Sequence, residues 1–202
     1  LFSYENPAIA GLLAGWSAAG TPITCLLPEG RALPQVAACL GRSQLQAGDA
    51  VQQGSLRVQV LPFVEQERYD ELLWACDVNF VRGEDSFVRA QWAGKPFVWH
   101  IYPQHDGVHM QKLHAFLNLY CAGLAQDAAR AVHVLWDAWN GGGENGTDDF
   151  MDSGHAWHQF LLYQSMLRHH GDDWSRHLSG NNLALNLLDF YRGIGKICPF
   201  EI

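Results

Sequence analysis

The chain has few positive charges. Lys and Arg number 13 against 21 Asp and Glu, so its 202 residues carry a formal net charge of −8 with histidine neutral. A surface for nucleic acid or for an anionic membrane needs clustered Lys and Arg, and we therefore expect neither of these partners. The same charge is compatible with a small phosphorylated ligand that is held at one local positive spot.

Long apolar runs and secretory features are also lacking. No run approaches the ~20 residues of a membrane span, and the N-terminus has neither the basic flank nor the apolar run of a signal peptide. The five cysteines include no CxxC pair. We interpret them as reduced, mostly buried thiols of a cytoplasmic protein. Because the sequence begins at Leu1 rather than with Met, and directly in strand-like sequence, we expect a fragment of a longer protein.

Several catalytic motifs are missing. The sequence has no GxGxxG after its first predicted strand, no Walker A loop, no GxSxG elbow and no HExxH, which argues against the chemistries that these motifs support. Among ten histidines, His105 with His109 and His155 with His158 have spacings that a helix can present to a metal. No third ligand accompanies either pair. We therefore expect no metal and no other cofactor, and interpret these histidines as surface or core residues.

What is present is enough apolar sequence for a sizeable core, since 48% of the residues are hydrophobic. In the first half, short apolar runs alternate with helical patterns, which predicts right-handed crossovers and a parallel sheet. The stretch 45–54 is predicted to be a polar connection. The predicted strands are 1–4, 23–27, 56–61, 78–81 and 97–102, and the helices between them are 8–19, 33–40, 65–76 and 87–93.

The second half is predicted to be helical. Its apolar residues recur at helical spacing, with a Gly- and acid-rich loop at 140–149, a separating segment at 175–180 and a tail at 193–202 that has weak order signals. The predicted helices are 108–121, 125–139, 156–170 and 183–192.

The segment after the strand 78–81 has the features of an anion site. Arg82 and Gly83 break the strand, and Glu84, Asp85 and Ser86 offer caps for the following helix. Free N–H groups and the helix dipole favour negative charge at such a helix start, and an arginine adds a planar fork that suits phosphate. An ordinary capped turn with Arg82 on the surface is the alternative.

The order 3-2-1-4-5 of a doubly wound sheet places the strands 1–4 and 78–81 side by side, with a crevice at their carboxyl ends. Aromatic residues fall at this rim, where they can stack on a nucleotide base. Gln66 lies there too and can hydrogen-bond a base edge. Packing in an ordinary core is the alternative for each aromatic. The aromatic residues are Phe2, Tyr4, Phe63, Tyr69 and Tyr102.

Residues 82–104 read RGEDSFVRAQWAGKPFVWHIYPQ. This run resembles the signature of the bacterial protein-arginine rhamnosyltransferases that modify elongation factor P, the EarP family, and the stretches 1–5 and 67–77 resemble that family too. The resemblance implies an α/β fold, the Rossmann-like, donor-binding C-terminal lobe of a GT-B glycosyltransferase. Residues 1–178 would form the nucleotide-sugar lobe, and 179–202 a C-terminal helix and tail. The family's N-terminal lobe, with an acceptor-side Asp in an Asp-Asn-Phe-Gly-Asp-type motif, is absent from this sequence.

The resemblance also implies roles for single residues. The reaction would be an inverting transfer of L-rhamnose from TDP-β-L-rhamnose to an arginine of elongation factor P, with Glu84 as the catalytic carboxylate. Glu84 can instead be a helix cap, and the whole chain can instead be a non-catalytic nucleotide-binding or protein-interaction module on the same α/β scaffold. The implied donor-binding residues are Phe2, Tyr4, Phe63, Gln66 and Tyr69 around the thymine nucleoside, Arg82, Asp85 and Ser86 around the pyrophosphate, and in addition Gly83 and Tyr102.

Overall fold

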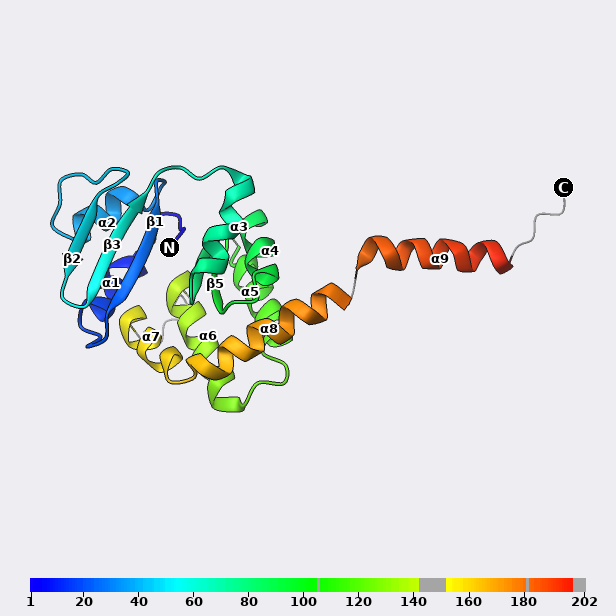
Figure 1. The fold of residues 1–202 in the computed structure, drawn as a ribbon. Coiled ribbons are helices and arrows are strands. Elements are labelled where there is room, and N and C mark those ends of the chain that lie inside the picture. Colours follow the sequence, from blue (N-terminus) through cyan, green and yellow to red (C-terminus); the bar gives the residue numbers. More distant parts are fainter. Residues whose placement is uncertain (105, 142–151, 181, 198–202) are drawn as a thin grey trace.

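The computed structural model describes residues 1–104, 106–141, 152–180 and 182–197 (Figure 1). His105, most of the predicted loop at 140–149 and the residues from 198 onward lie outside these ranges, so the predictions made for them stay untested. Within the described ranges, no helix combines the length and the apolarity that crossing a bilayer requires.

A three-stranded sheet forms one side of the molecule (Figure 1). Its order is β1-β3-β2, with β1 (Ile23–Pro28) parallel to β3 (Leu56–Leu61) and β2 (Ala50–Gln53) antiparallel to β3. The prediction of a polar connection at 45–54 is therefore wrong. Gly54, with a φ of 56°, turns the chain so tightly that the residues before it pair back onto β3.

A second sheet has two parallel strands, β4 (Asn79–Arg82) and β5 (Phe97–His100). The helix α3 (Gln66–Ala75) leads into β4, and α4 (Asp85–Trp92) connects β4 to β5. All four residues of β5 are buried, as expected for a parallel strand that is covered on both faces. This strand–helix–strand unit is the one that the sequence predicts.

The N-terminal segment lies between the two sheets. The Leu1 amino group donates to the carbonyl oxygen of Leu26 in β1 at 2.6 Å, and the Phe2 N–H donates to the carbonyl oxygen of Phe80 in β4 at 2.9 Å. The N-terminal segment thus lies between β1 and β4, which are the neighbours that the predicted strand order gives it.

This segment is nevertheless not a strand, so the prediction of a strand at 1–4 is wrong. In place of one continuous parallel sheet, the structure has two sheets, and β2 is antiparallel. Two main-chain hydrogen bonds are too few for a ladder. The carbonyl oxygen of Ser3 accepts from the Arg82 guanidinium at 3.3 Å instead of from a backbone N–H. The fold is mixed α/β with two small sheets.

Helices cover both sheets. The helix α1 (Ala8–Ser17) packs against α7 (Ser153–Leu161), and α2 (Leu33–Cys39) follows β1. A Cβ added to Gly15 would lie 2.6 Å from the Cα of Gly154, so the two glycines allow α1 and α7 to approach this closely. The helices α1 to α4 agree with the predicted ranges to within two residues at each end.

The C-terminal half is helical, as predicted, but its divisions differ. The predicted helix 156–170 is divided between α7 and the start of α8 (Gln164–Gly180), and α8 continues through the predicted break at 175–180. Tertiary contacts override the polar sequence there: the Trp174 indole donates to Gln91 at 3.2 Å and the Ser175 hydroxyl donates to the Trp92 carbonyl at 3.1 Å. The remaining helices are α5 (Val108–Tyr120), α6 (Gln126–Asn140), α8 (Gln164–Gly180) and α9 (Leu183–Ile197).

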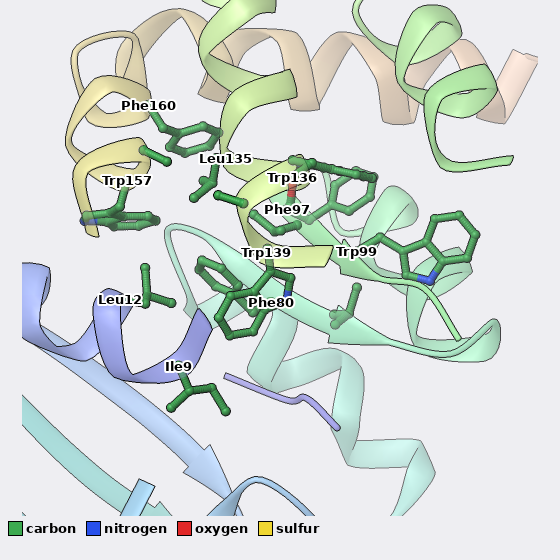
Figure 2. Close-up of a cluster of buried hydrophobic side chains, with 14 of the residues drawn as sticks. Ile9, Leu12, Phe80, Phe97, Trp99, Leu135, Trp136, Trp139, Trp157 and Phe160 are labelled. Atoms are coloured by element: carbon green, nitrogen blue, oxygen red, sulfur yellow. Dashed lines mark hydrogen bonds between the residues drawn. The ribbon is translucent and has the colours of Figure 1, made fainter. Parts of the chain in front are cut away.

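An aromatic core joins the small sheet to these helices (Figure 2). Phe80 of β4 packs edge-on against Trp139 of α6 with ring centroids 4.9 Å apart. Phe97 of β5 packs against Trp136, whose indole N–H donates to the Phe97 carbonyl at 3.0 Å. Such burial of large aromatic rings fixes β4 and β5 firmly, and with them the loop that follows β4.

Candidate functional site

An open cavity of about 490 Å³ lies at the carboxyl end of β4, beside the N-terminal segment. All but three of the predicted site residues line it, and Arg31 joins them. The strand, the turn and the start of α4 therefore meet the N-terminal segment where the sequence predicts. The lining residues are Phe2, Tyr4, Arg31, Arg82, Gly83, Glu84, Asp85, Ser86 and Tyr102.

Arg82 contacts two of the aromatic rings that line this cavity. The central carbon of its guanidinium lies 4.3 Å from the ring centroid of Phe2 and 4.6 Å from that of Tyr4, so the cation contacts both ring faces. Burial lowers the pKa of Arg82, and nearby Arg31 lowers it further, while Tyr4 opposes the change. An arginine is charged at neutral pH all the same. Half-buried between two rings, Arg82 is not the free surface residue of the alternative interpretation.

Gly83 makes the turn that directs Glu84 away from the strand. Its φ is 66°, a conformation that residues with a side chain rarely adopt. The Trp99 indole donates to the Gly83 carbonyl at 2.6 Å, and a Cβ at this position would lie 3.2 Å from the Tyr4 hydroxyl oxygen. The turn is thus held from β5 on one side and approached by Tyr4 on the other.

Glu84 precedes α4 but does not cap it. It is the residue at the N-cap position, yet its backbone is helical and its side chain accepts no hydrogen bond from the first turn. The prediction of a side-chain cap at this helix is therefore wrong. The Glu84 side chain is 84% exposed, and its carboxylate lies 3.6 Å from the Lys112 ammonium. Exposed and without a capping contact, the carboxylate can be reached by a ligand in the cavity.

The Asp85 carboxylate is occupied by its own helix and by α3. It forms an ion pair with Arg89 at 2.9 Å, and the Gln66 amide donates to it at 3.4 Å. Arg89 also pairs with Asp70 at 3.0 Å, which ties α4 to α3. The Asp85 carboxylate is thus engaged by Arg89 and Gln66, at the end of the helix where backbone N–H groups favour negative charge.

Of the three predicted residues that do not line the cavity, two lie next to its wall. The Tyr69 ring packs 5.8 Å from that of Phe2, and Gln66 contacts Asp85. Burial raises the pKa of Tyr69, and a hydrogen bond with Ser86 opposes that rise. Phe63 differs, because it is 79% exposed and the structure does not bring it to the other site residues. It lies in the connection 62–65, which has no secondary structure.

A second cavity of about 340 Å³ adjoins the first and shares Tyr4, Gly83, Glu84 and Tyr102 with it. The residues that it adds come from β5, from the segment after it and from α5, and they are not among the predicted site residues. Nor is Arg31 in the first cavity, although the position of Arg31 just after β1 points to the same sheet edge. The added residues are Trp99, Ile101, Gln104, His109 and Lys112.

Beneath Tyr4, His100 is buried at the end of β5. Its Nδ1 lies 2.9 Å from the Ser3 hydroxyl oxygen. Burial, and secondarily the charge of Arg82, lowers the pKa of His100 from 6.5 to about 4. The folded protein therefore binds a proton at His100 less readily than the unfolded chain does.

The lowered pKa of His100 makes the stability of the protein depend on pH. Because the folded pKa is depressed, the stabilisation is present above pH 6.5 and is lost as the pH falls towards 4. We expect the free energy of unfolding to fall by about 2 kcal/mol between pH 7 and pH 5 through this residue. Urea unfolding of the protein and of a His100→Asn variant at both pH values checks this. An equal pH dependence in the two proteins would contradict it.

The described residues hold no group of three or more His, Cys, Asp or Glu side chains arranged to bind a metal ion. His155 and His158 are both exposed on α7. The predicted pair of His105 and His109 includes His105, which lies outside the described residues.

Comparison with known proteins identifies the family. The sequence model described as Elongation-Factor P (EF-P) rhamnosyltransferase EarP matches residues 1–192. The chain belongs to the EarP family. This confirms the resemblance carried by residues 82–104, and both cavities lie inside the matched range.

Relatives within the EarP family are about twice as long as the chain. A protein-arginine rhamnosyltransferase of Pseudomonas aeruginosa is 56% identical over 143 residues, which cover 71% of this chain and 38% of that protein. The corresponding enzyme of Pseudomonas putida is 46% identical over 193 residues, which cover 95% of this chain and 49% of the enzyme. The chain thus spans half or less of the length of these relatives.

A solved structure from work on the structural basis of EarP-mediated arginine glycosylation of translation elongation factor EF-P superimposes with a TM-score of 0.82 at 43% identity. The match covers 96% of this chain and 59% of the other. The two therefore share their fold over nearly the whole of this chain.

Proposed function

We propose that this chain is the donor-binding lobe, Rossmann-like and of the GT-B type, of an inverting glycosyltransferase that moves L-rhamnose from TDP-β-L-rhamnose to an arginine of elongation factor P. The observation that carries the proposal is the first cavity, which combines aromatic rings, two arginines and a helix start in a member of the EarP family. We place the reaction in the cytoplasm. That location suits the four cysteines of the described ranges, which are free thiols.

In this proposal the donor spans the wall of the first cavity. The thymine base stacks near Phe2 and Tyr69, with the Gln66 amide within reach of its edge. The pyrophosphate lies against the Arg82 guanidinium and the N–H groups at the start of α4, because both favour phosphate. Arg31 adds a second cation. These groups take the place of a metal ion, and we propose that the reaction needs none.

Glu84 lines both cavities, and we propose that the transfer takes place beside its carboxylate. A guanidinium nitrogen of the acceptor attacks the anomeric carbon, the bond from that carbon to the pyrophosphate oxygen breaks, and TDP leaves with the electron pair. The proton that the nitrogen loses passes to water. Guanidinium is a poor nucleophile because its lone pairs are delocalised. The Glu84 carboxylate pins the group and localises its charge, and preorganised donors stabilise the charge that develops on the leaving pyrophosphate.

We expect Arg82→Ala to weaken TDP binding. A charge-assisted hydrogen bond to phosphate contributes about 1.5–3 kcal/mol, which corresponds to roughly 10- to 150-fold in dissociation constant. Isothermal titration of the chain with TDP measures this loss. Unchanged TDP affinity would remove Arg82 from the site.

Two further variants make that result specific. Arg82 also packs on Phe2 and Tyr4, so Arg82→Lys, which keeps the charge but loses the planar fork, separates phosphate binding from ring packing. Arg176→Ala removes an exposed arginine near the end of α8 and should leave TDP affinity unchanged. Melting temperatures of all variants show whether the N-terminal segment stays folded onto β4.

A further inference from the structure

Glu84 has an unusual position for a residue that must orient a substrate. Its side chain is 84% exposed, makes no capping hydrogen bond and follows a glycine turn. An exposed glutamate of this kind samples several rotamers unless something fixes its direction. Among the described residues, the one ion pair of Glu84 is to Lys112, at 3.6 Å.

Lys112 lies on α5, and together with Glu84 it lines the second cavity. Its ammonium lies 5.6 Å from the ring centroid of Trp99, over a ring that is itself fixed. Trp99 stacks on Phe87 at 4.0 Å with an interplanar angle of 20°, and its indole donates to the Gly83 carbonyl. One buried tryptophan thus holds both the turn before Glu84 and the cation beside its carboxylate.

The pair is not placed for stability. Both partners are largely exposed, and ion pairs of this kind contribute little to folding because water screens them. Its location is more informative. Glu84 lines both cavities, whereas Lys112 lines only the second, where Tyr4, Trp99 and Tyr102 provide aromatic walls. Aromatic walls with a carboxylate suit a guanidinium, which stacks on rings and binds carboxylates with two parallel hydrogen bonds.

We propose that Lys112 is the positioning residue for Glu84, and that the acceptor guanidinium enters the second cavity and replaces the Lys112 ammonium as the counter-ion of the Glu84 carboxylate. This inference rests on the proposed function. Before the acceptor binds, Lys112 directs the carboxylate into the cavity. When the acceptor arrives, the bidentate guanidinium takes its place, and the ammonium remains over the Trp99 ring.

The test uses a full-length enzyme, by which we mean this chain joined to the other half of a family member. Lys112→Met keeps the stem over Trp99 and removes the charge, and Lys112→Arg keeps the charge. We expect Lys112→Met to lower kcat/KM for elongation factor P about tenfold and Lys112→Arg to restore most of it. In a Glu84→Gln background, Lys112→Met should have no further effect, because it acts through Glu84. TDP affinity and melting temperature should not change.

Several outcomes would overturn the inference. Equal losses from Lys112→Met in the presence and absence of Glu84 would show that it acts independently. Weaker TDP binding by Lys112→Met would make it a donor contact instead. An active wild-type enzyme with an unaffected Lys112→Met variant would refute this inference alone, whereas a wild-type enzyme that binds TDP but transfers no rhamnose would refute the proposed function and this inference with it.

Discussion

Replacing Glu84 by Gln in the full-length enzyme is expected to lower the single-turnover rate of rhamnosyl transfer by about 10²–10³-fold, the size typical of one well-placed polar group in a closed site. The substitution removes the charge that pins the acceptor guanidinium and keeps the shape of the side chain. Because the neutral amide cannot offset the developing positive charge on the acceptor, the loss should appear in the chemical step.

The same substitution should change the stability of the folded protein very little. The Glu84 side chain is 84% exposed and accepts no capping hydrogen bond. Substitutions at such positions usually change stability by less than about 0.5 kcal/mol, whereas removing a working cap costs about 0.5–2 kcal/mol. If Glu84 is catalytic, the substitution lowers turnover and leaves stability unchanged. If Glu84 is structural, the substitution lowers stability and leaves turnover nearly unchanged.

Two measurements decide between them: thermal melting of the Glu84→Gln chain and single-turnover kinetics of the same variant in the full-length enzyme. Glu71→Gln is a matched control, since Glu71 is also exposed and lies on α3 in an ion pair with Arg68. A clear fall in melting temperature with near-normal turnover would make Glu84 a structural residue.

The second large effect concerns the chain by itself, which we expect to transfer no rhamnose to elongation factor P. The chain spans half or less of the length of its curated relatives, and its sequence lacks the Asp-Asn-Phe-Gly-Asp-type motif that we propose for the acceptor side. Holding two reactants in the correct geometry contributes roughly 7–11 kcal/mol to catalysis. Without the opposing lobe, the rate should fall below detection.

Mass spectrometry of elongation factor P after incubation with the chain and TDP-β-L-rhamnose measures this. The full-length enzyme is the positive control, and TDP binding by the isolated chain shows that it is folded. Rhamnosylated factor after incubation with the chain alone would refute the expectation, because the chain would then carry all the groups that transfer requires.

The sequence predicts the elements that its own local pattern determines. The unit of β4, α4 and β5 is predictable because an apolar run, a breaking Arg82-Gly83 pair and a helical pattern follow one another directly. The segment 1–4 has the alternation of a strand, but its main chain pairs with each neighbour only once. The strand β2 has one buried residue, Val51, among exposed ones, so its pairing is set by the Gly54 turn rather than by hydrophobic alternation.

The site shows the same limit. Arg82 to Ser86 are contiguous, so a strand–turn–helix pattern was enough to find them. The placement of Lys112 depends on how α5 packs beside Trp99, and no sequence pattern predicts that long-range contact. Phe63 was predicted at the rim because it follows β3, but the irregular connection 62–65 leaves it exposed. The prediction of a side-chain cap at the start of α4 is wrong because residue type alone does not determine where the Glu84 side chain points.

The central claim, that the chain binds a thymidine nucleotide as the donor lobe of a glycosyltransferase, is tested most directly by isothermal titration of the chain with TDP, ADP and NAD at one salt concentration. The account predicts that TDP binds and that ADP and NAD bind at least about tenfold more weakly, a difference of ~1.4 kcal/mol. Equal affinity for all three, or no binding of TDP, would contradict it.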